Sequence, residues 1–445
     1  MRKNNIERTI NLRSLLIVSL CVGSSVTLGI ELYNYIYALK NQSLVFSGED
    51  QDNVYMYKLS MIKVEIVSQL LSLVFNIASL FFSHVIWDHY PNQLIFTLVF
   101  YGMHYLVTIY PIDYFKRQFI FKKYPYNKPS SFQFSFPPKN PVLYIVLELF
   151  ILLFEVIVSK MTCLFSFADK EEESDAELLT MDQTPTTDIP SEPDSHYSFS
   201  FYKSSFWIVH FLILAIGYFC LSVMVPNMVN NNGSFKRVKD EDLLKRIQKF
   251  TKRVNFPMSS LYTTITKDDP PNAFVLGIFE KRIIVTKALF EMEPPPELAS
   301  IVAHEVGHWY HSDLISGYFM TIIPFLLLSI IIQIITHSGL ENFGYVNETP
   351  ICAVMLFSTL FFSVAKTFWN PFMNTIMRSF ERRADCFSSS FKLPIGDALI
   401  GLSNLSSQKY TPSPLYRWYH YSHPTVPERL TNLMNCPKYN WGQIE

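Results

Sequence analysis

The chain has 445 residues, 49% of them apolar and only 17% charged, whereas ordinary soluble proteins contain roughly 25% charged residues. Phenylalanine and tyrosine are unusually common, with 38 and 25 residues, and the mean hydropathy is +0.16. The formal net charge is −1, so no overall basic field favours a nucleic-acid partner. The composition therefore predicts an integral membrane protein that has the lipid bilayer, and not nucleic acid, as its partner.

Several stretches of the chain are apolar and long enough, at about 20 residues, to cross a bilayer as helices. The expected spans are residues 14–35, 64–87, 93–110, 141–163, 205–225, 314–336 and 351–369. Glu31 lies inside the first span but close to its end, which suggests a side chain that reaches back to the membrane surface.

A basic segment between the third and fourth expected spans suggests the orientation of the chain. It contains Lys116, Arg117, Lys122, Lys123, Lys128 and Lys139. Because cytosolic loops of membrane proteins carry an excess of lysine and arginine, we expect this segment in the cytosol. Alternation then places the acidic, proline-containing segment 168–203 in the lumen as a disordered linker. It also places the N-terminus in the lumen, although basic residues near the N-terminus favour the opposite side.

This orientation divides the chain into four parts. Residues 1–225 contain the first five spans, and residues 314–369 contain the last two. Residues 226–313 and 370–445 lie on the cytosolic side and together contain every chemical motif described below.

The strongest chemical motif is Ala303-His304-Glu305-Val306-Gly307-His308, which contains the pattern His-Glu-x-x-His. Residues four apart share one face of a helix, so His304 and His308 can both reach one Zn²⁺. Glu305 points about 100° away from His304, off the metal but within reach of its water, as a general base requires. Gly307 would let another element approach this helix closely. The alternative is a pair of structural histidines on a helix.

A catalytic zinc needs a third protein ligand, which is a carboxylate in sites of the His-His-Glu kind. Glu381 lies in Arg378-Ser379-Phe380-Glu381-Arg382-Arg383-Ala384-Asp385, a segment that follows the last expected span and is expected to be helical. Asp385 lies one turn after Glu381, so one carboxylate can bind the metal while the other orients a ligand imidazole. By itself, Glu381 among four other charged residues is more typical of a solvated helix face.

Two further clusters are candidates for substrate contacts. His423 and Arg429 lie close together in sequence, and such a pair can stabilise a tetrahedral oxyanion, although an ordinary surface loop is the alternative. Asn272 and Ala273 precede a short β-branched stretch, residues 282–286, that is expected to form a strand after a turn. An exposed edge there could bind a peptide by strand addition, and an ordinary hairpin is the alternative.

The cysteines show no Cys-x-x-Cys pair and mostly lie in apolar stretches. They are Cys21, Cys163, Cys220, Cys352, Cys386 and Cys436. We therefore expect buried, unpaired side chains rather than disulfides or thiolate metal sites.

Taken in chain order, these motifs resemble the type I CAAX prenyl proteases, membrane metalloproteases of the endoplasmic reticulum. The resemblance rests on four segments: the zinc motif at 304–309, the Arg-Ser-Phe-Glu segment within 374–385, the Tyr-His-Tyr-Ser-His-Pro segment within 414–429, and Tyr-Pro-Tyr-Asn-Lys at 124–128. The segment within 414–429 is the most specific, because many metalloproteases share the zinc motif. With the number and order of the spans, the resemblance covers nearly the whole chain.

The resemblance implies a fold and a site. The fold would be an all-α integral membrane protein whose seven transmembrane helices surround a large chamber, with a cytosolic zinc-metalloprotease domain that contains a small β-hairpin or sheet. One Zn²⁺ per chain would be bound by His304, His308 and Glu381, and Asp385 would orient one of the ligand imidazoles. The expected catalytic residues are Glu305, His423 and Arg429, and the expected substrate-binding residues are Asn272 and Ala273.

The resemblance also implies an activity and a location. The enzyme would remove the last three residues from farnesylated or otherwise prenylated proteins or peptides, and some family members make a second, upstream cut. It would be a multi-pass protein of the endoplasmic reticulum membrane with its active site facing the cytosol.

The sequence departs from the family pattern at positions that affect substrate choice. Asp268-Asp269-Pro270-Pro271 precedes Asn272, which is more similar to bacterial-type membrane quality-control metalloproteases. Met377 stands where serine is usual, and Arg382 and Arg383 replace an aromatic residue and a glutamine. Two alternatives stay open: a general quality-control protease without prenyl dependence, and a catalytically silent membrane scaffold, against which the intact Glu305 argues.

Overall fold

The computed structural model describes residues 11–41, 51–124, 146, 149–154, 156–157, 206–231, 235–257, 260–265, 271–277, 281–346, 348–405 and 412–437. Most of the expected fourth span, 141–163, lies outside the described residues, but those described between 146 and 157 are helical. The linker 168–203 and Cys163 lie outside the described residues altogether.

Six helices of the described chain are long and apolar enough to cross a membrane. They are α1 (Leu12–Lys40), α2 (Gln51–His89), the continuous segment Gln93–Lys123, α7 (Phe206–Asn231), α11 (Asp313–Ser338) and α12 (Ile351–Ser390). The segment Gln93–Lys123 consists of α3 (Gln93–His104), α4 (Tyr110–Phe115) and α5 (Phe121–Lys123), joined by two π-helical segments. The basic residues between Lys116 and Lys123 are therefore helical, whereas the sequence suggested a loop. The expected membrane fold is confirmed.

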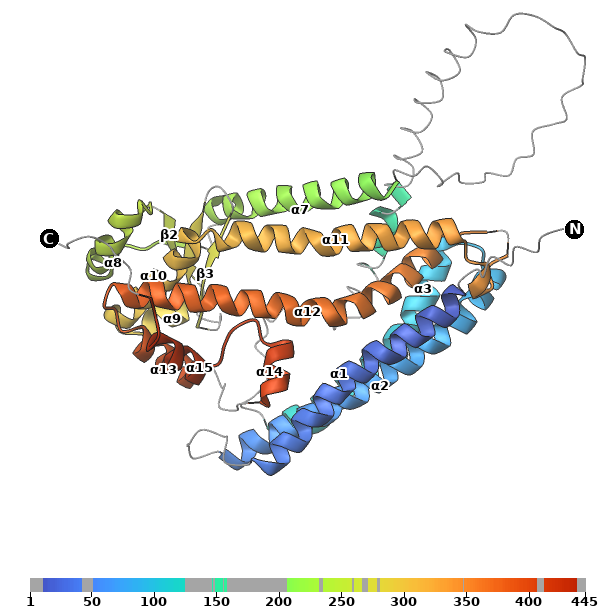
Figure 1. Cartoon of the computed structure of the whole chain (residues 1–445), viewed down its shortest axis with the longest axis horizontal. Helices are drawn as coiled ribbons and strands as arrows, with labels where there is room; N and C mark the ends of the chain where they lie inside the picture. Colours follow the sequence, from blue (N-terminus) through green and yellow to red (C-terminus); the bar gives the residue numbers. More distant parts are fainter. Residues whose placement is uncertain are drawn as a thin grey trace, which may run out of the picture.

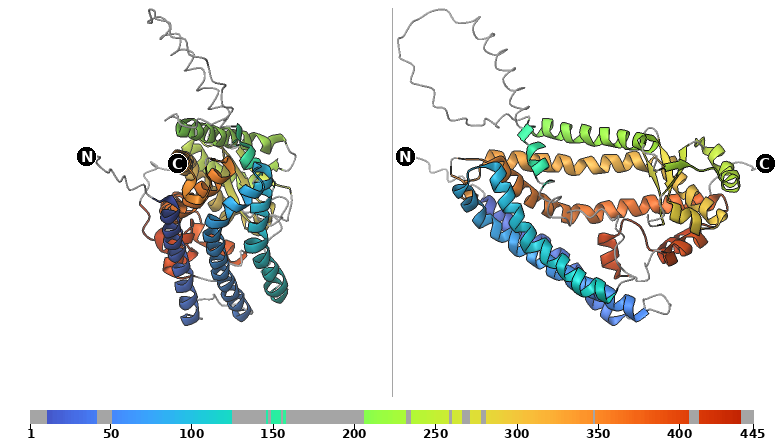
Figure 2. Two further views of the ribbon diagram at one scale, coloured as in Figure 1. Left: turned by 90° about the vertical axis from the view of Figure 1, so that its right-hand side faces the viewer. Right: turned by 180° about the vertical axis from the view of Figure 1, so that it is seen from behind.

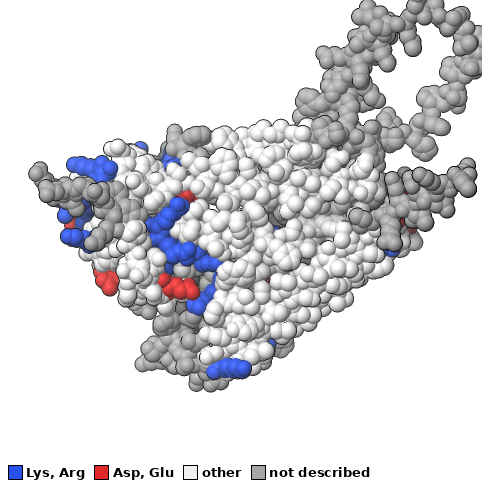
Figure 3. All heavy atoms as spheres, viewed as in Figure 1, with Lys and Arg blue, Asp and Glu red and all other residues white. Residues whose placement is uncertain are grey.

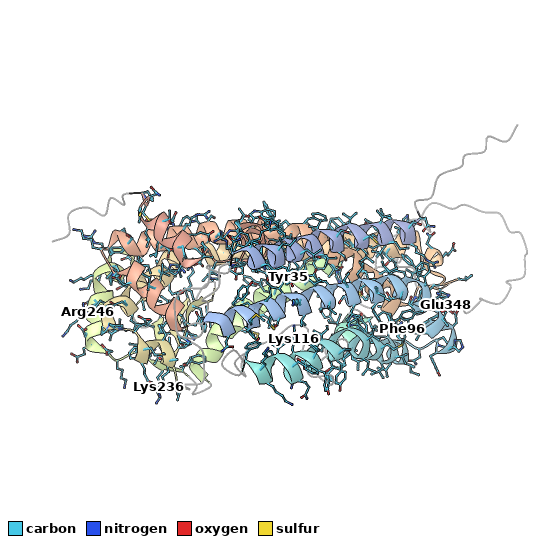
Figure 4. The ribbon with its side chains drawn as sticks, turned by 90° about the horizontal axis from the view of Figure 1, so that it is seen from below. Tyr35, Phe96, Lys116, Lys236, Arg246 and Glu348 are labelled. Carbon is cyan, nitrogen blue, oxygen red and sulfur yellow. A yellow bond between two sulfur atoms is a disulfide. The ribbon has the colours of Figure 1, made fainter. Side chains whose placement is uncertain are left out.

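The membrane helices form two groups that meet at one end of the molecule and diverge toward the other (Figure 1). One group contains α7, α11 and α12, which run side by side toward the expected protease domain, and the other contains α1, α2 and α3 (Figures 1 and 2). The start of α1 lies at the end opposite that domain (Figure 1). Seen from below, Phe96 lies near Glu348 at that end, and Lys116 lies nearer the domain marked by Lys236 and Arg246 (Figure 4).

The expected protease domain combines helices with one small sheet. Its helices are α8 (Glu241–Val254), α9 (Lys287–Met292), α10 (Pro295–Tyr310), α13 (Ile395–Leu405), α14 (Pro414–His420) and α15 (Val426–Leu433). Its strands are β1 (Phe235–Arg237), β2 (Leu261–Thr264), β3 (Ala273–Leu276) and β4 (Arg282–Val285), in the order β1-β2-β4-β3. The strand expected near residue 282 is therefore present, and β3 is an edge strand of the sheet.

On the face seen in Figure 3, charged side chains gather over the end of the molecule that contains the sheet, while the membrane helices are almost uncharged.

Helix α12 connects the membrane part to the expected protease domain without a break. Its 40 residues include the last expected span and continue to Ser390, with Pro371 accommodated inside the helix. The ligand candidate Glu381 therefore lies on an extension of a membrane-spanning helix, so the metal site is fixed directly to the membrane part of the fold.

Two expectations from the sequence are wrong. Cys386 and Cys436, 50 residues apart, form a disulfide instead of remaining unpaired. Glu31 does not extend outward from the helix bundle: it is 1% exposed, and its Oε1 lies 3.4 Å from Nε2 of His420 on α14. Among the other described cysteines, Cys352 is buried as expected, whereas those of α1 and α7 are exposed.

Candidate metal centre

The imidazoles of His304 and His308 project from one face of α10 toward the same point. Their Nε2 atoms lie 3.2 Å apart, and both side chains are largely buried. A carboxylate of Glu381 completes the group: its Oε2 lies 3.4 Å from Nε2 of His304, and its Oε1 lies 3.5 Å from Nε2 of His308. One donor atom from each of the three residues can be chosen so that all lie within 4.8 Å of one another, as in a metal site.

Gly307 explains how Glu381 reaches the histidines. A Cβ atom at this position would lie 3.0 Å from the Cα atom of Ala384, so only glycine allows α12 to pack this closely on α10. A buried hydrogen bond from Ser388 Oγ to the carbonyl of Ser300, at 2.7 Å, holds the same two helices together. The close approach that the sequence suggested for Gly307 is thus made by the helix that carries the third ligand candidate.

An aspartate lies within hydrogen-bond distance of Nδ1 of each imidazole. Asp385 Oδ1 lies 3.0 Å from Nδ1 of His304, and Asp313 Oδ2 lies 2.9 Å from Nδ1 of His308. An aspartate at Nδ1 favours the tautomer that carries its hydrogen there, which leaves the Nε2 lone pairs facing each other. Glu381 Oε2 is buried and receives no hydrogen bond from the described residues. Two converging lone pairs beside a buried carboxylate fit a divalent cation.

The aspartates are in turn held by arginines. Arg429 binds Asp385 with two nitrogens, Nε at 2.8 Å and Nη2 at 2.5 Å. Arg383 Nη2 lies 2.5 Å from Asp313 Oδ1. Two parallel Arg-Asp-His arrangements therefore converge on the site, one built on α12 and α15 and the other on α11 and α12.

The second arrangement was not foreseen from the sequence. Asp313 is the first residue of α11, and Ser312, whose φ is 57°, makes the tight turn that separates α11 from α10. The only signal was an acidic residue five positions after His308, at the start of an apolar span.

The electrostatics of the site favour positive charge on the imidazoles. Burial alone lowers the pKa of His308, but hydrogen bonds to Asp313 and Glu381 outweigh it and raise the pKa to about 10. Burial likewise opposes protonation of His304, while Asp385 and Glu381 raise its pKa. Burial raises the pKa of Glu305, whose side chain lies beside the group rather than in it. A cation bound to the imidazoles would replace a proton held at the same place.

The remaining candidate catalytic residues come from the segment after α13. His423, 64% exposed at its side chain, brings Nε2 to 3.2 Å from Glu381 Oε1. Arg429 is mostly buried, and its bidentate contact is with Asp385. Glu428, the neighbour of Arg429 in the sequence, caps α15 and lies 3.3 Å from Arg417.

A cavity of about 510 Å³ opens beside the cluster and contains Glu305, His308 and Glu381 in its wall. The end of β3, residues 275–277, lines it as well. The expected substrate residues Asn272 and Ala273 lie at the beginning of the same strand, where the backbone of Asn272 is bonded to Thr286, and are not part of the cavity wall.

Comparisons with known proteins agree with this site. Residues 237–436 match the family model of peptidase family M48. CAAX prenyl protease 1 from Saccharomyces cerevisiae is 27% identical over 250 residues, which cover 51% of this chain and 55% of that protein. The probable CAAX prenyl protease 1 of Schizosaccharomyces pombe is 30% identical over 213 residues, covering 45% and 44% of the two chains. These matches make the chain similar to peptidase family M48 and to type I CAAX prenyl proteases.

The chain spans about half the length of these curated relatives. The fold extends further: the crystal structure of S. mikatae Ste24p superposes with a TM-score of 0.64 at 19% identity, covering 94% of this chain and 99% of that one. A shorter similarity connects the chain to the protease HtpX homolog 1 of Sulfolobus acidocaldarius, at 40% identity over 65 residues, 14% of this chain and 21% of that protein. The match to a metalloprotease family implies a metal ion, which the His-His-Glu cluster could hold.

Proposed function

We propose that this protein is a zinc endopeptidase that removes the C-terminal tripeptide from prenylated CAAX proteins at the membrane. The observation that carries the proposal is the cavity, whose wall joins Glu305, His308 and Glu381 to the edge of β3 and to apolar faces of three membrane helices. One space thus offers hydrolytic groups, a strand edge for a peptide and an apolar surface for a lipid. The names of the similar proteins from two yeasts support the same substrate class.

His304, His308 and Glu381 would hold one Zn²⁺, because two imidazoles and a carboxylate are a usual ligand set for catalytic zinc. Zinc bound there supplies Lewis-acid chemistry, polarising a carbonyl and acidifying water. Asp385 and Asp313 keep the imidazoles in the tautomer and orientation that such binding needs.

Glu305 is the proposed general base and acid. It takes the proton of the attacking water and later delivers it to the leaving amine. His423 is the proposed donor to the oxyanion, because its half-exposed ring reaches the edge of the cluster at Glu381. Arg429 is more consistent with a positioning role, since the Nε–Nη2 edge of its guanidinium is occupied by Asp385. Asn272 and Ala273 are retained as substrate contacts through the start of the β3 edge.

We propose the endoplasmic reticulum membrane as the location, with the four-part division inferred from the sequence and the protease domain in the cytosol. The arrangement of α1 and the protease domain at opposite ends supports a lumenal N-terminus (Figure 1). The Cys386–Cys436 disulfide opposes a cytosolic domain, because disulfides are rare in that compartment. A glycosylation sequon engineered into residues 180–195 tests the orientation: modification in reticulum membranes supports it, and an unmodified site overturns it.

The activity is tested with purified protein and matched peptides ending in a CAAX sequence, with and without a farnesyl group. We expect release of the intact tripeptide, read by mass spectrometry, and a strong preference for the farnesylated peptide. Glu305→Gln should retain zinc and lose about 10²–10⁴ in turnover. Equal cleavage of both peptides would favour instead a general quality-control protease, which the similarity to the HtpX homolog suggests. No cleavage by protein that contains zinc would favour a catalytically silent scaffold.

A further inference from the structure

The cavity beside the metal site extends away from the protease domain, between the membrane helices. Its apolar arm is lined by Tyr218 and Leu221 of α7, Gly317 and Tyr318 of α11, and Met373 and Met377 of α12. All three helices are membrane-spanning. The arm is therefore an apolar recess between helices of the membrane part, and it is continuous with the hydrolytic groups.

Two tyrosines give the arm a rigid wall. The rings of Tyr218 and Tyr318 stack with their centroids 5.5 Å apart and their planes 9° from parallel. The hydroxyl of Tyr318 donates to the carbonyl of Ala215 at 3.1 Å, which fixes this ring to α7. A wall of this kind defines a length and a shape for whatever occupies the arm.

The chemistry of a CAAX substrate determines which of its parts would reach this recess. The lipid is attached to the cysteine that directly precedes the scissile bond. When that bond lies at His304, His308 and Glu381, the thioether lies within one residue of the cluster. The lipid must then bind an apolar surface close to the metal, because leaving it exposed to water would lose the favourable free energy of burying its apolar surface. Among the surfaces that line the cavity, the recess between α7, α11 and α12 meets this requirement.

We propose that the recess between α7, α11 and α12 binds the isoprenoid tail of the substrate and limits its length. The proposal rests on the proposed function, since it assigns a place to the lipid of the same substrate. Met377 stands where the family usually has serine, and its larger side chain narrows the recess. This difference from the family pattern therefore affects the length of lipid that fits.

Gly317 offers a test that leaves the packing intact. A Cβ atom at this position meets no atom within 4 Å, so a larger side chain can begin there without a backbone clash and would occupy the recess. Gly217, on α7 beside Tyr218, also has free space at its Cβ but is exposed and outside the recess. Gly317→Leu and Gly217→Leu are therefore a matched pair.

The measured quantity is the ratio of kcat/KM for a farnesylated peptide to kcat/KM for its ten-carbon geranylated analogue. Gly317→Leu should lower this ratio by roughly tenfold or more, because a filled pocket excludes the longer chain first. Gly217→Leu should keep the wild-type ratio. An unchanged ratio in Gly317→Leu, with normal zinc content, would overturn the proposal and would show that the tail, or a bilayer acyl chain, is bound elsewhere.

A second variant changes the recess in the opposite direction. Met377→Ala should raise the relative kcat/KM for a twenty-carbon geranylgeranylated peptide, and equal effects on all chain lengths would contradict the assignment. The two proposals fail in different ways. If wild type prefers farnesylated over unprenylated peptide while both variants leave the chain-length ratios unchanged, the recess is misassigned and the proposed function stands. If wild type shows no prenyl preference, both are overturned.

Discussion

Nδ1 of His308 donates a hydrogen bond to Oδ2 of Asp313 at 2.9 Å, across the turn that separates the metal-site helix from a membrane-spanning helix. Asp313 is 4% exposed at its side chain and is also held by Arg383. The orientation of one proposed metal ligand therefore depends on the first residue of α11, and so on how the protease domain is attached to the membrane.

Replacing Asp313 with asparagine should weaken metal binding. The amide can still accept a hydrogen bond, but it lacks the charge that makes the imidazole a stronger ligand, and such partners typically contribute about 10–100-fold in affinity. We expect a loss of this size in competition with a zinc chelator. Asp397→Asn, at an exposed carboxylate of α13, is the control and should bind zinc normally. Wild-type affinity in Asp313→Asn would show that this aspartate only caps its helix.

Gly307→Ala should move Glu381 on α12 away from the histidines on α10. The added Cβ would lie 3.0 Å from the backbone of Ala384 and 3.2 Å from the Cβ atom of Phe387, so α12 must move and carry Glu381 with it. Overpacking of this kind typically costs about 1–3 kcal/mol. Zinc content and unfolding temperature should both fall, whereas Gly217→Ala, with free space at its Cβ, should change neither. Full zinc retention in Gly307→Ala would contradict the close-approach explanation.

The pKa of His308 gives a pH dependence of stability with a definite sign. Burial lowers this pKa, but the hydrogen bonds to Asp313 and Glu381 outweigh it and raise the value from 6.5 to about 10. A raised pKa stabilises the folded state fully below pH 6.5, and this contribution is lost as the pH rises toward 10. The unfolding temperature of chelator-treated protein should therefore fall across this range, and by less in Asp313→Asn. With excess Zn²⁺, acid should instead destabilise, because protons then compete with the metal. Identical pH profiles for both proteins would refute the assignment.

The sequence predicted the parts of the molecule that depend on local pattern. Hydropathy located the described membrane helices, and helical spacing predicted the convergence of His304 and His308. The sequence predicted that another element packs closely against Gly307, but not that this element is α12. Helical spacing shows which residues share a face, but not which distant helix packs against that face. Glu381 needed the family resemblance to distinguish it from a solvated helix face.

What the sequence missed depends on contacts between distant segments. Glu31 was misinterpreted because hydropathy gives a position along a helix and not the neighbour that covers it, which here is His420 of α14. Asp313 was overlooked because its approach to His308 requires the sharp turn at Ser312. The disulfide was missed because its cysteines lie 50 positions apart without a Cys-x-x-Cys pair, and such spacing does not show which segments meet in the fold.

The Cys386–Cys436 disulfide should stabilise the protease domain. It ties α12 to the segment after α15, the helix that carries Arg429. Disulfides that close loops of this kind typically contribute about 2–4 kcal/mol. Reductant should therefore lower the unfolding temperature of wild type but not that of Cys436→Ser, and Cys220→Ser, at an exposed unpaired cysteine, should respond like wild type. A wild-type response to reductant that persists in Cys436→Ser would show that another bond is responsible.

The last prediction concerns Asn34, a buried polar residue of the membrane-spanning helix α1. Its Oδ1 accepts a hydrogen bond from the backbone N–H of Ser413 at 2.9 Å, and both residues are almost fully buried. Ser413 is the N-cap of α14, which leads directly into the segment of His423. Asn34→Ala leaves a buried N–H without its acceptor, which typically costs about 1–3 kcal/mol.

We expect Asn34→Ala to displace α14 but not α10 or α12. The change should therefore affect catalysis without affecting zinc binding. Asn34→Ala should retain zinc and show a lower kcat, as expected if His423 is mispositioned in the transition state. Asn41→Ala, at the end of the same helix where the side chain donates to the carbonyl of Tyr37, controls for a general effect on α1 and should keep kcat within about twofold. Loss of zinc together with kcat in Asn34→Ala would indicate that α1 supports the whole domain, and an unchanged kcat would mean that α14 does not position His423.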